Sequence, residues 1–252
     1  MAYYDLSKQR RKNVYSEMEK NIHEDFSKNK THNIIKYASD QDTYIRKNCY
    51  LIIGRLYKSN GKIREQILTV LETLSGSENE KIRQTVVYAL GEIGKTDFHA
   101  IEELLNAFLH EKHHSVKNGL TGALKQMGEK NPVPVILWVK NNINNCSVDM
   151  KPRILHGLEL RGRTHPEDLL PLLRKIVHSG TDKKTEKMII HIIGQISYKK
   201  GCLEKVASAL SLWENKEFVS LCKKEILKVH WAYKKFSVYE IKATEKYLEE
   251  NL

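Results

Sequence analysis

The chain has 252 residues and a formal net charge of +11, with 40% hydrophobic and 29% charged side chains. It contains no run of 18 apolar residues, which excludes a membrane-spanning helix, and its first residues lack the apolar block of a secretory signal. We therefore expect a cytoplasmic protein with no membrane partner.

The positive charge is concentrated towards the two ends of the sequence. Residues 1–62 carry 13 basic and 7 acidic side chains, and residues 183–252 carry 14 and 9. Residues 63–130, in contrast, carry 8 basic and 10 acidic side chains. Two basic ends could hold a polyanion at two places, whereas a uniformly positive groove is not expected.

A helix is expected first, over about residues 6–28, because Val14, Met18, Ile22 and Phe26 recur every four positions. Six helix pairs and a closing helix are expected after it. The first helices of the pairs are predicted near 31–39, 62–75, 97–110, 132–143, 166–178 and 202–214. The second helices are predicted near 43–58, 79–94, 114–128, 149–162, 184–197 and 216–234.

The second helices follow one pattern that recurs about every 35 residues. Each clear copy follows a polar turn, opens with a basic residue and continues as an apolar helix. The basic residues are Arg46, Arg83, Lys117 and Arg153, spaced by 37, 34 and 36 positions. A period in this range is typical of solenoids built from helix pairs, in which each repeat contacts mainly its neighbours.

This pattern resembles the HEAT-repeat family, especially the short bacterial kind that ends in A-L-G-x-I-G. The residues that carry the resemblance are Ile82-Arg83 and Ala89-Leu90-Gly91-Glu92-Ile93-Gly94, with Ile45-Arg46 and Ile193-Gly194-Gln195-Ile196 as echoes. The resemblance covers roughly residues 30–235 and implies an all-α fold, an α-α superhelix of about six helix pairs. We expect residues 1–30 and 236–252 to form capping helices and residues 31–235 to form the repeats.

Two interpretations of the aligned basic residues stay open. In HEAT repeats the arginine of the second helix typically pairs with a turn acid of its own or the adjacent unit. The acids that precede the four basic residues by four to six positions are Asp40, Glu78, Glu111 and Asp149. The alternative is contact with the phosphates of a nucleic acid, a role that arginine also suits.

A second candidate site lies at the end of the fourth repeat, between Leu155 and His165. Arg161, Arg163 and the free amides of the helix that follows Thr164 could together bind a phosphate. The plain alternative is a capped turn whose arginines are solvated.

No metal site, cofactor or catalytic motif is predicted. The neighbouring histidines His110, His113 and His114 lack the i, i+4 spacing and the third ligand of a zinc site. The iron-binding hydroxylases with HEAT repeats carry paired His-Glu steps on several helices, and that repetition is not found here. The four cysteines show no ligand spacing and are expected to be structural thiols.

The three tryptophans, Trp138, Trp213 and Trp231, are expected mainly to fill the core or the space between repeats. A tryptophan that stacks on a base or sugar would instead need an exposed ring beside positive charge.

The function favoured from the sequence is binding of nucleic acid, most simply duplex DNA. The residues expected to contact phosphates are Arg46, Arg83, Lys117, Arg153, Arg161 and Arg163. The chain is also similar to the helical-repeat proteins of DNA alkylation repair in architecture, size and basicity, which implies a role in DNA repair and, as a further alternative, alkylpurine DNA glycosylase activity. The catalytic set of that family is not matched as a motif, so no catalytic residue is predicted.

The competing interpretation is a non-enzymatic scaffold that binds a partner protein on a concave face, because extended helical surfaces suit peptides and partner domains. The nearly neutral middle of the sequence favours this use over contact with DNA. In either case we expect a monomer.

Overall fold

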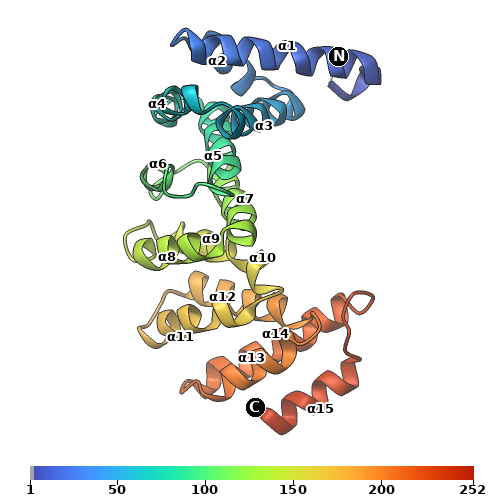
Figure 1. Cartoon of the computed structure of the whole chain (residues 1–252). Coiled ribbons are helices and arrows are strands. Elements are labelled where there is room, and N and C mark those ends of the chain that lie inside the picture. Colours follow the sequence, from blue (N-terminus) through green and yellow to red (C-terminus); the bar gives the residue numbers. More distant parts are fainter. Residues whose placement is uncertain (1–2) are drawn as a thin grey trace. The chain divides into compact units, whose positions relative to one another are not determined.

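The computed structural model describes residues 3–252, and every regular element in that range is a helix (Figure 1). The expectation of an all-helical repeat fold is confirmed. The chain folds as two compact units, Met1–Pro134 and Val135–Leu252. The division into caps and repeats at residues 30 and 235 stays a prediction. Within residues 3–252, each helix is too short or too polar to cross a lipid bilayer.

The first unit begins with a long helix and continues with helix pairs. Its helices are α1 (Lys8–Ser27), α2 (His32–Ala38), α3 (Thr43–Ser59), α4 (Arg64–Ser75), α5 (Glu80–Gly94), α6 (Glu102–Asn106) and α7 (His114–Lys130), with 3-10 turns η1 (Tyr3–Asp5) and η2 (Gly61–Ile63). The second helices of its pairs are α3, α5 and α7, and α5 packs against both of the others (Figure 1).

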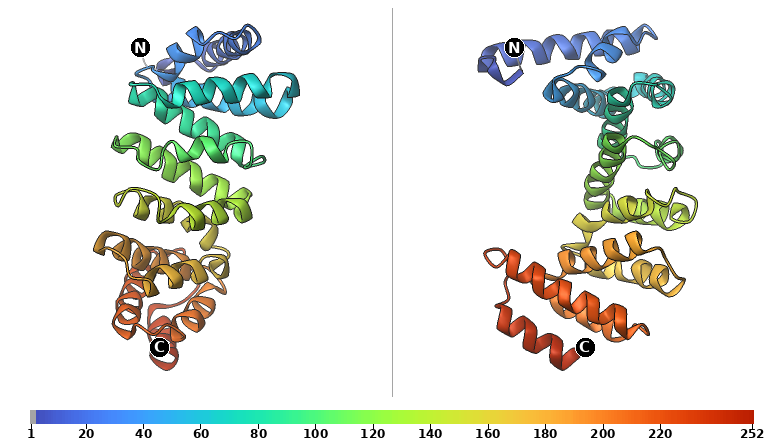
Figure 2. Two further views of the ribbon diagram at one scale, coloured as in Figure 1. Left: turned by 90° about the vertical axis from the view of Figure 1, so that its left-hand side faces the viewer. Right: turned by 180° about the vertical axis from the view of Figure 1, so that it is seen from behind.

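The second unit contains the remaining pairs. Its helices are α8 (Pro132–Asn142), which starts at the boundary, α9 (Lys151–His156), α10 (Glu159–Gly162), α11 (Leu170–His178), α12 (Lys183–Ser197), α13 (Cys202–Ser211), α14 (Lys216–Ala232) and α15 (Ile241–Asn251), with the 3-10 turn η3 (Pro166–Asp168). Figure 2 shows this part of the chain from two further sides, in yellow to red. Here α12 packs against α9, α13 and α14, and α15 lies against α13 and α14.

The apolar stripe of each second helix forms the core between neighbouring repeats. In α5 the predicted stripe of Ile82, Val86, Leu90 and Ile93 is buried. Gly91 lies where α5 meets α7, and a Cβ atom at this position would come within 2.8 Å of the Cβ of Ala123. The glycine of the A-L-G-x-I-G pattern therefore lets two successive second helices approach closely.

The prediction of a helix at 97–110 is mostly wrong, because within this stretch only Glu102–Asn106 is α-helical. The apolar side chains of this stretch are nevertheless buried, including those of Phe98 and Phe108. Four-residue turns replace the helix, since the amide of Ile101 donates to the carbonyl of Phe98 and the amide of Phe108 donates to the carbonyl of Leu105. These tight turns bury the same apolar positions without a continuous α-helix.

The helix predicted at 149–162 is divided into α9 and α10. The interruption falls at Gly157 and Leu158, where the amide of Leu158 donates to the carbonyl of Leu155 at 2.9 Å. A glycine inside a helix lowers its stability, so a break at this position is physically reasonable. Both short helices contact α12 of the next repeat.

Candidate functional site

Arg46 of α3 holds the turn that precedes its own helix. Its Nη1 atom donates to the carbonyl oxygens of Asp40 at 2.6 Å and Gln41 at 3.2 Å. The acid predicted to pair with this arginine therefore uses its backbone carbonyl instead of its carboxylate. These two hydrogen bonds go to uncharged carbonyls, and the Arg46 guanidinium also attracts the carboxylate of Asp42.

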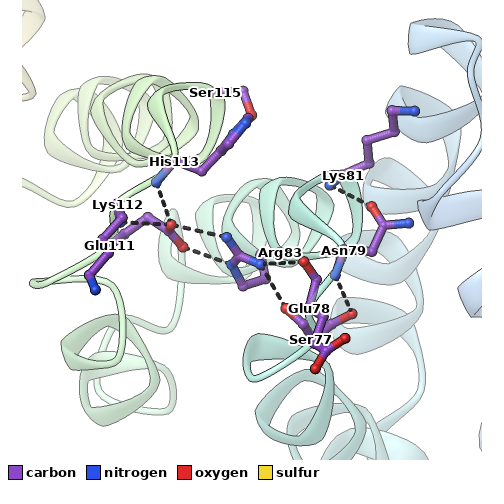
Figure 3. Close-up of polar contacts among 9 residues, drawn as sticks. All are labelled: Ser77, Glu78, Asn79, Lys81, Arg83, Glu111, Lys112, His113 and Ser115. Atoms are coloured by element: carbon purple, nitrogen blue, oxygen red, sulfur yellow. Dashed lines mark hydrogen bonds and ion pairs between the residues drawn. The ribbon is translucent and has the colours of Figure 1, made fainter.

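Arg83 of α5 repeats this arrangement and adds an ion pair (Figure 3). Its Nη1 atom donates to the carbonyl oxygens of Ser77 at 2.7 Å and Glu78 at 3.1 Å. Its Nε and Nη2 atoms bind the two carboxylate oxygens of Glu111 at 2.8 and 3.0 Å. One arginine thus joins the turn before α5 to the turn before α7.

Glu111 is the acid on which this connection converges. One of its oxygens also accepts hydrogen bonds from the backbone amides of Lys112 at 2.8 Å and His113 at 2.7 Å (Figure 3). Burial alone would raise the pKa of Glu111, but the Arg83 guanidinium and the two amides lower it below its ordinary value. The side chains of Arg83 and Glu111 are only 18% and 7% exposed.

The other two aligned basic residues lie on different helices. Lys117 lies half-buried on α7 in the first unit, together with Arg46 and Arg83. Arg153 lies half-buried on α9, in the second unit. The predicted phosphate-binding residues are therefore distributed over both units.

Arg161 and Arg163 bind separate internal partners in the second unit. The Nε atom of Arg161 lies 2.7 Å from a carboxylate oxygen of Asp168, in the turn that follows. The Nη2 atom of Arg163 pairs with Glu159 and donates to the amide oxygen of Gln195 at 3.0 Å. The two guanidinium groups are thus held by protein partners, which disfavours the predicted shared phosphate site.

A tyrosine surface lies on α3 and α5 of the first unit. The rings of Tyr50 and Tyr88 stack with their centroids 5.0 Å apart. They border a hollow of about 390 Å³, whose other lining residues are Thr43, Tyr44, Arg46, Lys47, Gln84 and Thr85. Tyr44 and Lys47 are accessible to solvent, so aromatic area and positive charge are both available to a ligand here.

The tryptophans divide into two buried residues and one exposed residue. Trp138 and Trp213 are 0% and 3% exposed, as expected for core residues. Trp231 is 64% exposed, and the ammonium of Lys234 lies 5.9 Å from the centroid of its ring. Phe236 nearby is 72% exposed. We call residues 231–238 the aromatic-basic segment.

Sequence reasoning did not select either of these surfaces. The repeat pattern does not align the two tyrosines of the first surface. Tyr50 stands four positions after Arg46, whereas Tyr88 stands five positions after Arg83. The second carried a usable signal, since two lysines stand between the aromatic residues in WAYKKF. That alternation of aromatic and basic residues is a known feature of nucleic-acid-binding surfaces.

The helix pairs, their buried second-helix stripes and the turn-binding arginines define a HEAT-repeat helical solenoid. The chain belongs to the Cnd1 family, described as non-SMC mitotic condensation complex subunit 1, whose model matches residues 11–155. Among solved structures, the designed armadillo repeat protein YIII(Dq)4CqI is similar at 13% identity and a TM-score of 0.33, covering 78% of this chain and 98% of that chain. No protein with a curated description matches the chain.

Proposed function

We propose that this chain is a non-enzymatic scaffold that binds an acidic segment of a partner protein at the tyrosine surface of α3 and α5. The observation that carries the proposal is the stacked pair of Tyr50 and Tyr88 beside an open hollow with Arg46 and Lys47 at its border. Family membership supports the proposal, because the family description names a subunit of a complex.

The chemistry of this surface favours a protein ligand. Tyrosine and arginine are enriched at the centres of protein interfaces, since they offer large contact areas and directed hydrogen bonds. Arg46 binds two uncharged carbonyls besides its attraction to the carboxylate of Asp42, and the exposed Lys47 beside it adds a second positive charge. A segment with carboxylates next to apolar side chains would complement both features.

The test removes the two stacked rings. The wild-type chain is used to capture partner proteins, and each recovered partner is purified and titrated against the wild type and against the double variant Tyr50→Ala, Tyr88→Ala. We expect the double variant to weaken binding at least about tenfold, or about 1.4 kcal/mol. Equal affinity of both proteins for that partner would overturn the proposal.

The matched control is the double variant Val133→Ala, Leu137→Ala. It removes two exposed apolar side chains of α8, neither of which lines the hollow beside Tyr50 and Tyr88. We expect this control to bind the partner like the wild type. Circular dichroism of all three proteins checks that a loss of binding does not come from unfolding.

A second candidate function, binding of nucleic acid, is favoured by the aromatic-basic segment. The exposed ring of Trp231 beside Lys234 meets the condition for stacking on a base, and Lys235 is exposed next to it. The basic excess of residues 183–252 supports this location. Within this candidate function, duplex DNA as the ligand and a role in DNA repair stay proposals. So do the phosphate contacts of the six basic residues named from the sequence.

Salt dependence and two double variants test this candidate. Binding of a labelled duplex or single strand should weaken with salt with a log–log slope of about −0.9 per phosphate neutralised on a duplex. Lys234→Gln, Lys235→Gln should reduce both affinity and slope, whereas Lys242→Gln, Lys246→Gln on α15 removes the same charge and should change them less. Absence of binding to either oligonucleotide at low salt would reject this function.

A further inference from the structure

The second unit brings two histidines and a buried glutamate to one place. They are His156 at the end of α9, Glu159 at the start of α10 and His191 in α12, and one ligand atom from each lies within 4.8 Å of the other two. Glu159 is 2% exposed and the histidines are half-buried. Two imidazoles and a carboxylate are the three-residue donor set found in catalytic zinc sites.

The local fold explains why these side chains meet. His156 and Glu159 are three positions apart across the break between α9 and α10, and the Nε2 atom of His156 lies 2.6 Å from a carboxylate oxygen of Glu159. Because α12 packs against both short helices, His191 faces them from the next repeat. The rings of His156 and His191 meet edge to face with centroids 5.8 Å apart.

Neighbouring basic residues hold the carboxylates in place. Arg163 pairs with one oxygen of Glu159 and leaves the other oxygen directed at His156. Glu225 of α14 is likewise shared between a basic residue and a histidine. One of its oxygens lies 3.0 Å from Nζ of Lys228, and the other lies 3.6 Å from Nδ1 of His191. Such outer contacts orient metal ligands and raise their basicity.

We propose that His156, Glu159 and His191 bind a zinc ion, and that Glu225 positions His191. A tetrahedral zinc site with bonds of about 2.0 to 2.2 Å has ligand atoms about 3.4 Å apart. The present separations run from 2.6 Å to at most 4.8 Å, so side-chain movements of about 1 Å reach that geometry. The ion replaces the contact between His156 and Glu159 and links the fourth repeat to the fifth.

This site contains none of His110, His113 and His114, the neighbouring histidines that were considered as zinc ligands in the sequence and rejected for their spacing. The spacing of His156 and Glu159 alone would not identify it, because the third ligand comes from a position 32 residues further along the chain. The site is independent of the tyrosine surface and of the aromatic-basic segment, so its test does not depend on the proposed function.

The experiment uses the full chain without an affinity tag, freed of metal by a chelator and titrated with zinc chloride. We expect one zinc ion per chain, with a dissociation constant below about 1 μM, and a higher thermal midpoint when zinc is present. Cobalt(II) should give the visible absorption of a four-coordinate ion with nitrogen and oxygen ligands. Absence of saturable binding would overturn the proposal and leave an internal ion-pair network as the correct description.

Three variants locate the ion. His191→Ala removes a half-buried ligand without leaving Glu159 unpaired, and we expect it to lower zinc affinity at least a hundredfold while the chain stays folded. Glu225→Gln should lower the affinity tenfold to a hundredfold, as expected for a positioning residue. His178→Ala, whose side chain is 73% exposed, is the control and should bind zinc like the wild type. Unchanged affinity in His191→Ala would exclude this site.

Discussion

The ion pair of Arg83 and Glu111 connects two repeats through side chains that are mostly buried. Replacing Arg83 with glutamine removes the cation and leaves the carboxylate with only its backbone amides. We expect Arg83→Gln to lower the free energy of unfolding by about 3 kcal/mol, as for other broken buried pairs. Chemical denaturation measures this change.

The matched control is Arg174→Gln, which breaks an exposed pair with Glu214. Exposed pairs contribute little to stability, so this variant should keep the denaturation midpoint of the wild type. Arg83→Gln could instead keep the wild-type midpoint and no longer bind a ligand that the wild type binds. That result would show that Arg83 contacts the ligand, and would contradict its role in stabilising the fold.

The lowered pKa of Glu111 predicts how stability depends on pH. Because the folded chain holds this carboxyl at a lower pKa than the unfolded chain, the stabilisation is fully present above the unfolded pKa of about 4.3. It is lost as the pH falls through the folded pKa. Stability measured between about pH 6 and pH 3 should therefore decrease less steeply in Glu111→Gln than in the wild type. Identical slopes would contradict this assignment.

The sequence indicated that an aligned arginine could bind a turn acid of its own or the adjacent repeat, but not which acid or which of its atoms. Glu111 stands six positions before Lys117 of its own repeat, yet it binds Arg83, 28 positions earlier. Asp40 stands six positions before Arg46, yet its carbonyl is the acceptor. Side-chain reach and the direction of each turn decide these contacts, and neither can be derived from spacing alone.

Among the helices, those with a regular apolar stripe were predicted to within a few residues. Helix α5 was expected at 79–94 and spans Glu80–Gly94, and α12 was expected at 184–197 and spans Lys183–Ser197. The helix predicted at 97–110 was wrong because four-residue turns bury its apolar residues as effectively as a helix would. A buried apolar run does not by itself distinguish these two backbones.

The close approach of α5 and α7 depends on the absence of a side chain at Gly91. In Gly91→Ala the new methyl group would lie 2.8 Å from the Cβ of Ala123, so the helices must separate. We expect a loss of about 1 to 3 kcal/mol in thermal or chemical unfolding. The double variant Gly91→Ala, Ala123→Gly should recover part of this loss.

Gly76 provides a control for the change from glycine to alanine itself. It lies at the end of α4 with a negative φ, and the nearest atom to an added Cβ is 3.8 Å away. Gly76→Ala should therefore be neutral or stabilising by about 0.4 to 1 kcal/mol. Equal losses at both positions would mean that backbone entropy or helix propensity, not packing, governs Gly91.

The closing helix α15 is joined to its neighbours through a buried histidine. The Nδ1 atom of His230 lies 3.2 Å from the hydroxyl of Thr244 in α15, and its Nε2 atom lies 3.1 Å from the hydroxyl of Ser197 in α12. Burial lowers the pKa of His230 to about 4. The imidazole is therefore neutral in the folded chain near pH 7.

This lowered pKa predicts a second loss of stability in acid. The unfolded histidine binds a proton below about pH 6.5, so stability is fully present above that value and falls by about 3 kcal/mol as the pH approaches 4. The variant His230→Gln should lose this dependence, whereas the exposed control His99→Gln should keep it. Urea denaturation between about pH 6.5 and pH 4 measures the stability of each protein. If the stability of His230→Gln fell with pH as steeply as that of the wild type, His230 would not be the group responsible.

For the molecule as a whole, the repeat architecture was predictable and the candidate sites were not. Repetition in the sequence marks the helix pairs, because each repeat must bury the same stripe against its neighbour. The tyrosine surface and the cluster of His156, Glu159 and His191 arise where non-equivalent positions of adjacent repeats meet. Such contacts depend on how two helices face each other, which a one-dimensional period does not contain.

Hydrogen exchange of backbone amides, followed by mass spectrometry on the full chain, tests the stacked-pair fold most directly. We expect the slowest exchange in α5 and α7 of the first unit and in α12 and α14 of the second, because these helices are packed on several sides. Faster exchange is expected at residues 107–113 and 233–240, which lie outside these helices. Weak, uniform protection along the chain, or strong protection confined to α1 and α15, would contradict the account.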